Sequence, residues 1–224
     1  MKNQIIRNVV FLCAALVFSP VFLSAADTST IYRISEMDLK SLTERAAQLN
    51  DQIRHSPANE GAAYDLGIVY CFMAIKDSKA YAQPAVDRLD RLHQKMPNDA
   101  LILCYLGNVN TLIAKESWNP LTKSIRVKRG VEYMDAAVKM EPINIEVRMM
   151  RGNNSRNLPA FLDRRPVAYE DLTHVAELLQ KDPKAHRDLK VSVYRTLSAM
   201  HREDGNKAQS EKFGRLADAA EHEK

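Results

Sequence analysis

Apolar residues return along most of the chain every three or four positions, which is the spacing of one face of an α-helix. The first such stripe contains Leu42, Ala46 and Leu49. We expect Ser35 to cap the start of this helix, with Asp38 as an acidic residue in its first turn. The pattern predicts about nine helices, over residues 36–55, 59–76, 84–96, 99–115, 120–140, 143–155, 166–181, 184–202 and 206–222. We therefore expect an all-α chain.

Two of these stretches differ from the others. Residues 99–115 are apolar on almost every side, as in a helix that neighbours cover on several faces, so we expect this helix at the centre of the fold. Residues 206–222 carry a single apolar stripe, which suits a helix that closes the end of a stack. Pro84, Pro120 and Pro166 are each expected at the first helical position, where proline is tolerated.

Prolines and glycines recur with a common period. The prolines are Pro57, Pro97, Pro142 and Pro183, separated by 40, 45 and 41 residues, and ten residues after the first three come Gly67, Gly107 and Gly152. Because glycine destabilises a helix interior, its recurrence predicts points where two helices approach too closely for a side chain. A constant period of this length is typical of stacked pairs of helices.

The repeating unit resembles the tetratricopeptide repeat family. The first unit has that family's order of residues: Leu66-Gly67, Tyr70, Ala85, Leu89, Leu92 and Pro97. The second keeps Leu106-Gly107, Ala137 and Pro142 but has Asn110 at the aromatic position, and the third keeps Gly152 but has Arg151 and Ser155 at the leucine and aromatic positions. The resemblance implies a short right-handed α-solenoid of antiparallel helix pairs over residues 36–224, with degenerate repeats.

The resemblance also implies a binding surface, because this family holds partners in the concave face made by the first helix of each unit. Carried over, the partner-binding positions are Tyr64, Asn108, Asn153, Arg156, Asn157, Tyr194 and Arg202. The asparagines are suited to bond the backbone of an extended peptide and the arginines to pair with its carboxylates. An equal alternative is that each asparagine is satisfied within the fold. The inserted segments 115–120 and 157–165 are expected to carry specificity.

The first residues have the pattern of a secretory signal peptide. Lys2 and Arg7 precede an apolar core at 9–18, and Ser24 and Ala26 are small residues at signal-peptidase spacing, so we expect cleavage after residue 26. Residues 27–35 are then a flexible N-terminal segment. The protein is expected to be exported, periplasmic or secreted, with no transmembrane segment after cleavage; the alternative is a membrane anchor formed by an uncleaved signal.

Charge and cysteine content narrow the classes of partner. The formal net charge of +4 falls to +2 when Lys2 and Arg7 are removed, and this near balance argues against nucleic acid. Cys71 and Cys104 remain in the exported part, where disulfides persist. We expect two small buried hydrophobic side chains, with a single disulfide as the alternative.

Basic residues gather between positions 120 and 165, where ten Lys or Arg stand against five Asp or Glu. The proposed basic patch contains Lys123, Arg126, Lys128, Arg129, Arg148 and Arg151. Such a patch suits an acidic peptide, or an anionic glycan or lipid of the cell envelope. The alternative is a solvated face with local ion pairs to Glu132, Asp135 and Glu146.

The sequence lacks the common motifs of catalysis, among them zinc-protease, phosphate-loop, nucleophile-elbow and haem-attachment patterns. We therefore expect a protein that is not an enzyme and has no cofactor and no metal site. Trp118 stands in a loop before Pro120, where it either folds over a neighbouring helix or anchors a partner. The sequence thus predicts an exported scaffold that binds a protein or peptide.

Overall fold

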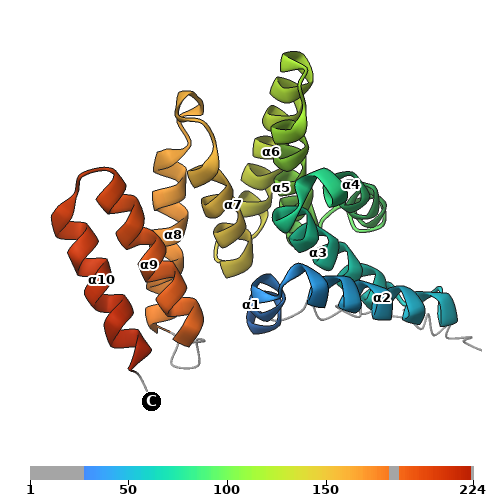
Figure 1. The fold of residues 1–224 in the computed structure, drawn as a ribbon, viewed down its shortest axis with the longest axis horizontal. Helices are drawn as coiled ribbons and strands as arrows, with labels where there is room; N and C mark the ends of the chain where they lie inside the picture. Colours follow the sequence, from blue (N-terminus) through green and yellow to red (C-terminus); the bar gives the residue numbers. More distant parts are fainter. Residues whose placement is uncertain (1–27, 182–186, 223–224) are drawn as a thin grey trace, which may run out of the picture.

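The computed structural model describes residues 28–181 and 187–222, and every regular element in these ranges is a helix (Figure 1). The helices are α1 (Thr28–Glu36), α2 (Leu39–His55), α3 (Glu60–Lys76), α4 (Ser78–Lys95), α5 (Ala100–Glu116), α6 (Pro120–Met140), α7 (Ile145–Asn157), α8 (Arg165–Lys181), α9 (Arg187–Glu203) and α10 (Lys207–Glu221), with a short 3-10 turn η1 (Ala160–Leu162) between α7 and α8. The all-α prediction is confirmed. The expected signal peptide at 1–26 and Pro183 lie outside the described residues.

Most helices begin at an Asp or Asn whose side chain accepts a hydrogen bond from the backbone of the first turn. These caps are Asp38, Asn59, Asp77, Asp99, Asn119, Asn144 and Asn206. Two predicted helix starts are corrected by them. Asp38, rather than Ser35, caps α2, and Asp77 starts α4 so early that Pro84 lies inside the helix instead of at its first position. Pro84 has no N–H to donate to the carbonyl of Ala80, four residues earlier in the helix. Both residues are exposed, so that carbonyl can accept a hydrogen bond from water.

The helices pack as consecutive pairs. α3 packs against α4, α5 against α6, α7 against α8 and α9 against α10. Both α3 and α4 contact α5, both α5 and α6 contact α7, and α8 contacts α9. α2 packs on the outer side of α3 at the N-terminal end (Figure 1). The result is an all-α, solenoid-like stack.

The three recurring glycines occupy equivalent places in this stack. Each lies on the first helix of its pair and faces the second: Gly67 meets Leu92 of α4, Gly107 meets Gly130 of α6, and Gly152 meets α8. A Cβ atom added to Gly107 would lie 2.6 Å from the carbonyl oxygen of Gly130, closer than any side chain tolerates. The prediction that these glycines mark close helix contacts is confirmed.

α5 is the central, buried helix that the sequence predicted over residues 99–115. Residues 100–111 of α5 are all buried, and Leu106 has no exposed surface. One apolar cluster runs from α1 through α7 and a second joins α8, α9 and α10. Between them, α7 meets α8 through buried ion pairs of Arg148 and Arg151 with Asp171 and through the close approach of Gly152 to Leu172.

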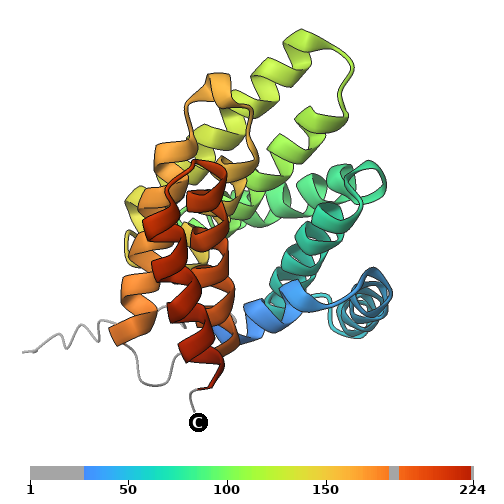
Figure 2. The same ribbon diagram turned by 60° about the vertical axis from the view of Figure 1, so that its left-hand side comes forward.

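The N-terminal segment 27–35, expected to be flexible, instead contains helix α1 from Thr28 onward. Ile31 and Ile34 lie one turn apart and are buried against the core, with 1% and 9% of their surface exposed. α1 contacts α3 and α7, and the hydroxyl of Tyr32 donates to the carbonyl of Asp188 at the start of α9 at 3.4 Å. α1 therefore crosses the first helices of three pairs, as the blue helix in Figure 2 shows. A short stretch with only two buried isoleucines gave a weak periodic signal.

Candidate functional site

Three of the residues expected to bind a partner are part of the core. Tyr64, Asn108 and Tyr194 are 6%, 5% and 6% exposed. The Tyr64 hydroxyl donates to Asp99 at 3.3 Å, and the Oδ1 atom of Asn108 accepts from the amide of Asn154 at 2.8 Å. Burial raises the pKa of the Tyr64 phenol, with a further contribution from the Asp99 carboxylate. Tyr64 and Asn108 join neighbouring units, and Tyr194 packs against Phe213 within the last pair, so these buried side chains are not available to a partner, which corrects their assignment.

Of the other four predicted positions, one lines a groove and three do not. Arg156 lines an open groove of about 730 Å³ between α1, α7 and α9, together with charged residues of both signs such as Glu36, Arg187 and Asp188. Asn153 is half-buried, and its carbonyl accepts from the side chain of Asn157 at 2.8 Å, a contact within one helix. Neither asparagine nor the exposed Arg202 lines the groove. The structure therefore brings only one predicted residue to this concave, mixed-charge surface.

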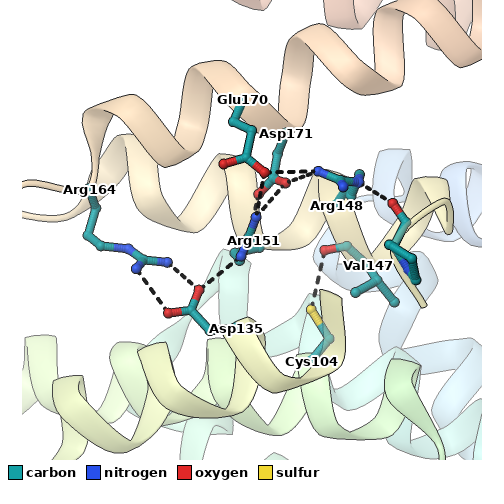
Figure 3. A network of polar contacts seen from close by, with 9 residues as sticks. Cys104, Asp135, Val147, Arg148, Arg151, Arg164, Glu170 and Asp171 are labelled. Atoms are coloured by element: carbon teal, nitrogen blue, oxygen red, sulfur yellow. Dashed lines mark hydrogen bonds and ion pairs between the residues drawn. The ribbon is translucent and has the colours of Figure 1, made fainter. Parts of the chain in front are cut away.

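The α7 part of the predicted basic patch is buried in ion pairs. Arg148 and Arg151 are each 8% exposed, and both bind Asp171 of α8, which has no exposed surface (Figure 3). The distances are 2.8 Å from Arg148 Nη1 to Asp171 Oδ1, and 2.7 Å from Arg151 Nε to Asp171 Oδ2. Arg148 also donates to the carbonyl of Pro142. These two arginines hold α7 to α8, so their assignment to a surface patch was wrong.

The same network reaches α6 through Asp135. This carboxylate accepts from Arg151 Nη1 at 3.1 Å and from Arg164 at 2.6 and 3.0 Å (Figure 3). Arg164 lies just before α8, so one chain of ion pairs connects three helices. Because charges removed from water need close partners, such a network fixes the relative position of the pairs α5–α6 and α7–α8.

The remaining cations of the predicted patch lie on the N-terminal half of α6. Arg126 is half-buried and donates to Asn110 of α5 at 2.8 Å. Lys123, Lys128 and Arg129 are exposed, and among residues 28–181 and 187–222 only Lys128 of the three has a paired carboxylate, Glu132 at 3.9 Å. This end of α6 thus presents positive charge to solvent.

An apolar groove lies beside these cations. It has a volume of about 510 Å³ and is bounded by one face of α6 and by the segment that joins α7 to α8. Its apolar residues are Pro120, Val127 and Val131 on the α6 side and Pro159, Phe161 and Leu162 on the other. We call it the α6–η1 groove. Both chain segments expected to carry specificity, 115–120 and 157–165, contribute residues to it.

Large apolar side chains stand open to solvent at the same end of the molecule. Trp118 is 91% exposed, Phe161 84%, Leu121 69% and Ile125 51%. They come from the α5–α6 and α7–α8 connections and the start of α6, which point in the same direction in both ribbon views (Figures 1 and 2). Trp118 does not fold over a neighbouring helix. Four such side chains at one end of the molecule, one of them in the groove itself, favour an interaction site there, since single exposed apolar residues are ordinary but several together are not.

The cysteines of the described ranges form no disulfide, and no metal-holding group of side chains is found there. Cys71 and Cys104 are buried and free, so the alternative of a disulfide is wrong. Burial raises the pKa of the Cys71 thiol to about 12, which leaves little thiolate at neutral pH. No group of three or more His, Cys, Asp or Glu side chains in the described ranges could hold a metal ion. None of the helices described is both long and apolar enough to cross a bilayer.

No protein-family model matches the sequence, and comparisons with curated proteins and with solved structures gave no match. The fold itself defines the class: an all-α protein of stacked helix pairs with an apolar and cationic groove at one end. The resemblance to tetratricopeptide repeats was carried by a few residues per unit, and these are the residues that pack the pairs together.

Proposed function

We propose that this protein is an exported, non-enzymatic scaffold of tetratricopeptide type that binds a partner protein at the α6–η1 groove. The observation that carries the proposal is an apolar groove that contains the exposed Phe161, with Trp118, Leu121 and Ile125 also exposed within five residues of its lining residue Pro120. Export is supported by the signal-like pattern of residues 1–26.

The groove is a better candidate than the concave face that the family resemblance implied. On the concave face, α1 already contacts α3 and α7, and the open space beside it is lined by Arg156, Arg187 and Arg195 together with Glu36, Asp188 and Glu221, so its charges largely balance. At the α6–η1 groove, an unfilled apolar surface remains. Burial of such surface contributes most of the free energy of protein association.

An anionic glycan or lipid of the cell envelope is the second candidate. Lys123, Lys128 and Arg129 favour it, because they are exposed and their only nearby carboxylate is Glu132 in the part of the chain that the structure describes. A glycan has little apolar surface, however, and would leave Trp118 and Phe161 uncovered. Binding that disappears at moderate salt would favour the anionic ligand, because screening weakens exposed charges far more than apolar contacts.

Site-specific photo-crosslinking tests the proposed function. The amino acid p-benzoylphenylalanine replaces Trp118 in one variant, Arg195 of the concave groove in a second, and the exposed Gln94 of α4 in a control. After irradiation in envelope extract, we expect a protein adduct of discrete mass from position 118 and none from position 94. Adducts from position 195 alone would place the partner on the concave face, and no protein adduct from either groove would contradict the proposal.

A further inference from the structure

We propose that the α6–η1 groove receives an amphipathic α-helix of the partner, with an apolar ridge that enters the groove and Asp or Glu along its edges. This inference rests on the proposed function and adds the chemistry of the bound segment. Three features of the groove carry it: its direction along a helix, its apolar lining and the sign of the charges at its rim.

The groove runs along one face of α6. Its lining residues there follow each other at intervals of one or three positions, as on one face of a helix: Pro120, Lys123, Ser124, Val127, Lys128, Val131 and Glu132. From Pro120 to Val131 the helix rises about 16 Å, at 1.5 Å per residue. A partner helix of about three turns would span that length, with anchors at the first, fourth or fifth, and eighth positions of its ridge.

The two walls are apolar and of different origin. Val127 and Val131 come from α6, whereas Phe161 and Leu162 come from η1. Helices pack by inserting the ridge of one into the groove of another, and here the second wall is supplied by a turn instead of a helix. The groove therefore leaves room for one further helix to pack along α6, on the face that α6 shares with η1.

The rim is positive. Lys123 and Lys128 line the groove and are exposed, with Glu132 of the same lining 3.9 Å from Lys128. Arg164, also in the lining, is neutralised by Asp135 at 2.6 Å. Among the lining residues of α6, Lys123 is left without a paired carboxylate in the described ranges, and acidic residues on the partner would complement this positive charge.

The concave shape distinguishes a helix from a lipid surface. A bilayer would accept the protruding Trp118 and Leu121, but it has no ridge that fills the space between Val127 and Leu162. Apolar surface inside the groove would then stay in contact with water or lipid headgroups. A helix buries both the rim and the groove, so it is the occupant that we favour.

Trp118 gives a direct signal for the test, because it is the only tryptophan of the chain and is 91% exposed. The probes are three designed helical peptides that lack tryptophan: one with leucines on one face and glutamates on its flanks, one with lysines in place of the glutamates, and one with the acidic composition in scrambled order. Vesicles of phosphatidylglycerol and of phosphatidylcholine complete the set. Burial of the indole shifts its emission to shorter wavelength.

We expect the acidic amphipathic peptide to bind and to shift the Trp118 emission, and the basic and scrambled peptides to bind at least about tenfold more weakly. Equal binding of the scrambled peptide would overturn the helix, and equal binding of the basic peptide would overturn the role of the rim charges. A shift with phosphatidylglycerol vesicles but with no peptide would overturn the inference in favour of a membrane surface.

Variants locate the bound peptide. Val127→Glu places a charge in the groove, and Phe161→Ala removes an exposed wall residue that contributes nothing to the core; each should weaken binding by about tenfold or more. Ile143→Glu is the matched control, because Ile143 is 73% exposed but lies in the α6–α7 connection, outside the groove lining. Circular dichroism confirms that each variant is folded. Unchanged affinity in folded Val127→Glu and Phe161→Ala would overturn the site.

The two proposals fail in different ways. If position 118 crosslinks to a partner protein but no acidic helix binds, the docking function stands and the helical occupant is wrong. If the peptide binds but no partner protein crosslinks, the groove accepts the proposed chemistry while the scaffold function is contradicted.

Discussion

The basic stretch between residues 120 and 165 contains two groups of cations with opposite surroundings. Arg148 and Arg151 of α7 are buried against Asp171, and Arg151 also binds Asp135, whereas Lys123 and Arg129 of α6 are exposed. The difference comes from the neighbouring helix, since α8 brings the buried Asp171 to α7, whereas no carboxylate of the described residues pairs with Lys123 or Arg129. The density of cations along a sequence therefore does not show where a positive surface lies; the positions of the carboxylates decide it.

The largest effect is expected when the carboxylate that pairs with the buried arginines of α7 is removed. Asp171→Ala leaves Arg148 and Arg151 without their main partner in a site from which water is excluded. We expect the free energy of unfolding to fall by about 3 to 5 kcal/mol, the cost of leaving a buried charge uncompensated. Urea unfolding followed by circular dichroism measures this change.

Asp90→Ala, at an exposed position of α4, is the control and should change the free energy of unfolding by less than about 0.5 kcal/mol. A loss below about 1 kcal/mol in Asp171→Ala would show that the arginines find other partners and that the network does not fix α7 to α8.

A second prediction concerns Glu146, in the first turn of α7. Burial raises the pKa of its carboxyl from 4.5 to about 8, so the folded protein holds a proton that the unfolded chain releases at lower pH. Stability contributed by this group is complete below pH 4.5 and is lost as the pH rises to about 8. We expect Glu146→Gln to be more stable than the original protein above pH 8 by about 1 to 3 kcal/mol.

Melting temperatures between pH 4 and pH 9 measure this dependence, and the slope should be smaller in Glu146→Gln. The matched control is Glu132→Gln, because Glu132 is exposed on α6 and pairs with Lys128 only at 3.9 Å. Equal slopes in Glu146→Gln and in the original protein would contradict the raised pKa.

The smallest expected effect on stability is at the other group of cations. The double variant Lys123→Gln and Arg129→Gln should change the free energy of unfolding by less than about 0.5 kcal/mol, because both side chains are exposed and have no ion pair in the described part of the chain. Denaturant unfolding is the measurement. A loss above about 1 kcal/mol would mean that these cations stabilise the fold, and the contrast with α7 would disappear.

The local parts of the fold were predictable. Apolar spacing located the helices from 39 to 221 to within a few residues, and the periodic glycines identified where the paired helices meet. Both depend on neighbours three or four residues apart, or on a repeat visible in the sequence. Pro84 and α1 show the limit of this reasoning. The cap at Asp77 starts α4 before the proline that was expected to begin it. The burial of Ile31, which holds α1 in place, depends on contacts with distant helices that a short amphipathic segment does not reveal.

The candidate site was predictable only in part. The inserted segments 115–120 and 157–165 were recognised as the places for specificity, but their meeting in one groove depends on how α5–α6 and α7–α8 stack. The family resemblance pointed to Tyr64, Asn108 and Tyr194, which the structure buries, because a pattern of repeat positions does not show how deeply each unit packs on the next.

The sequence by itself determined the all-α class, the pairing of helices and the glycine contacts, since these follow from periodic apolar residues and backbone sterics within one repeat. The tertiary structure alone decided which charges are buried and which are exposed. Burial of a charge depends on a partner such as Asp171, twenty or more residues away from Arg151 and Arg148, and only the stacking of helices brings the two together.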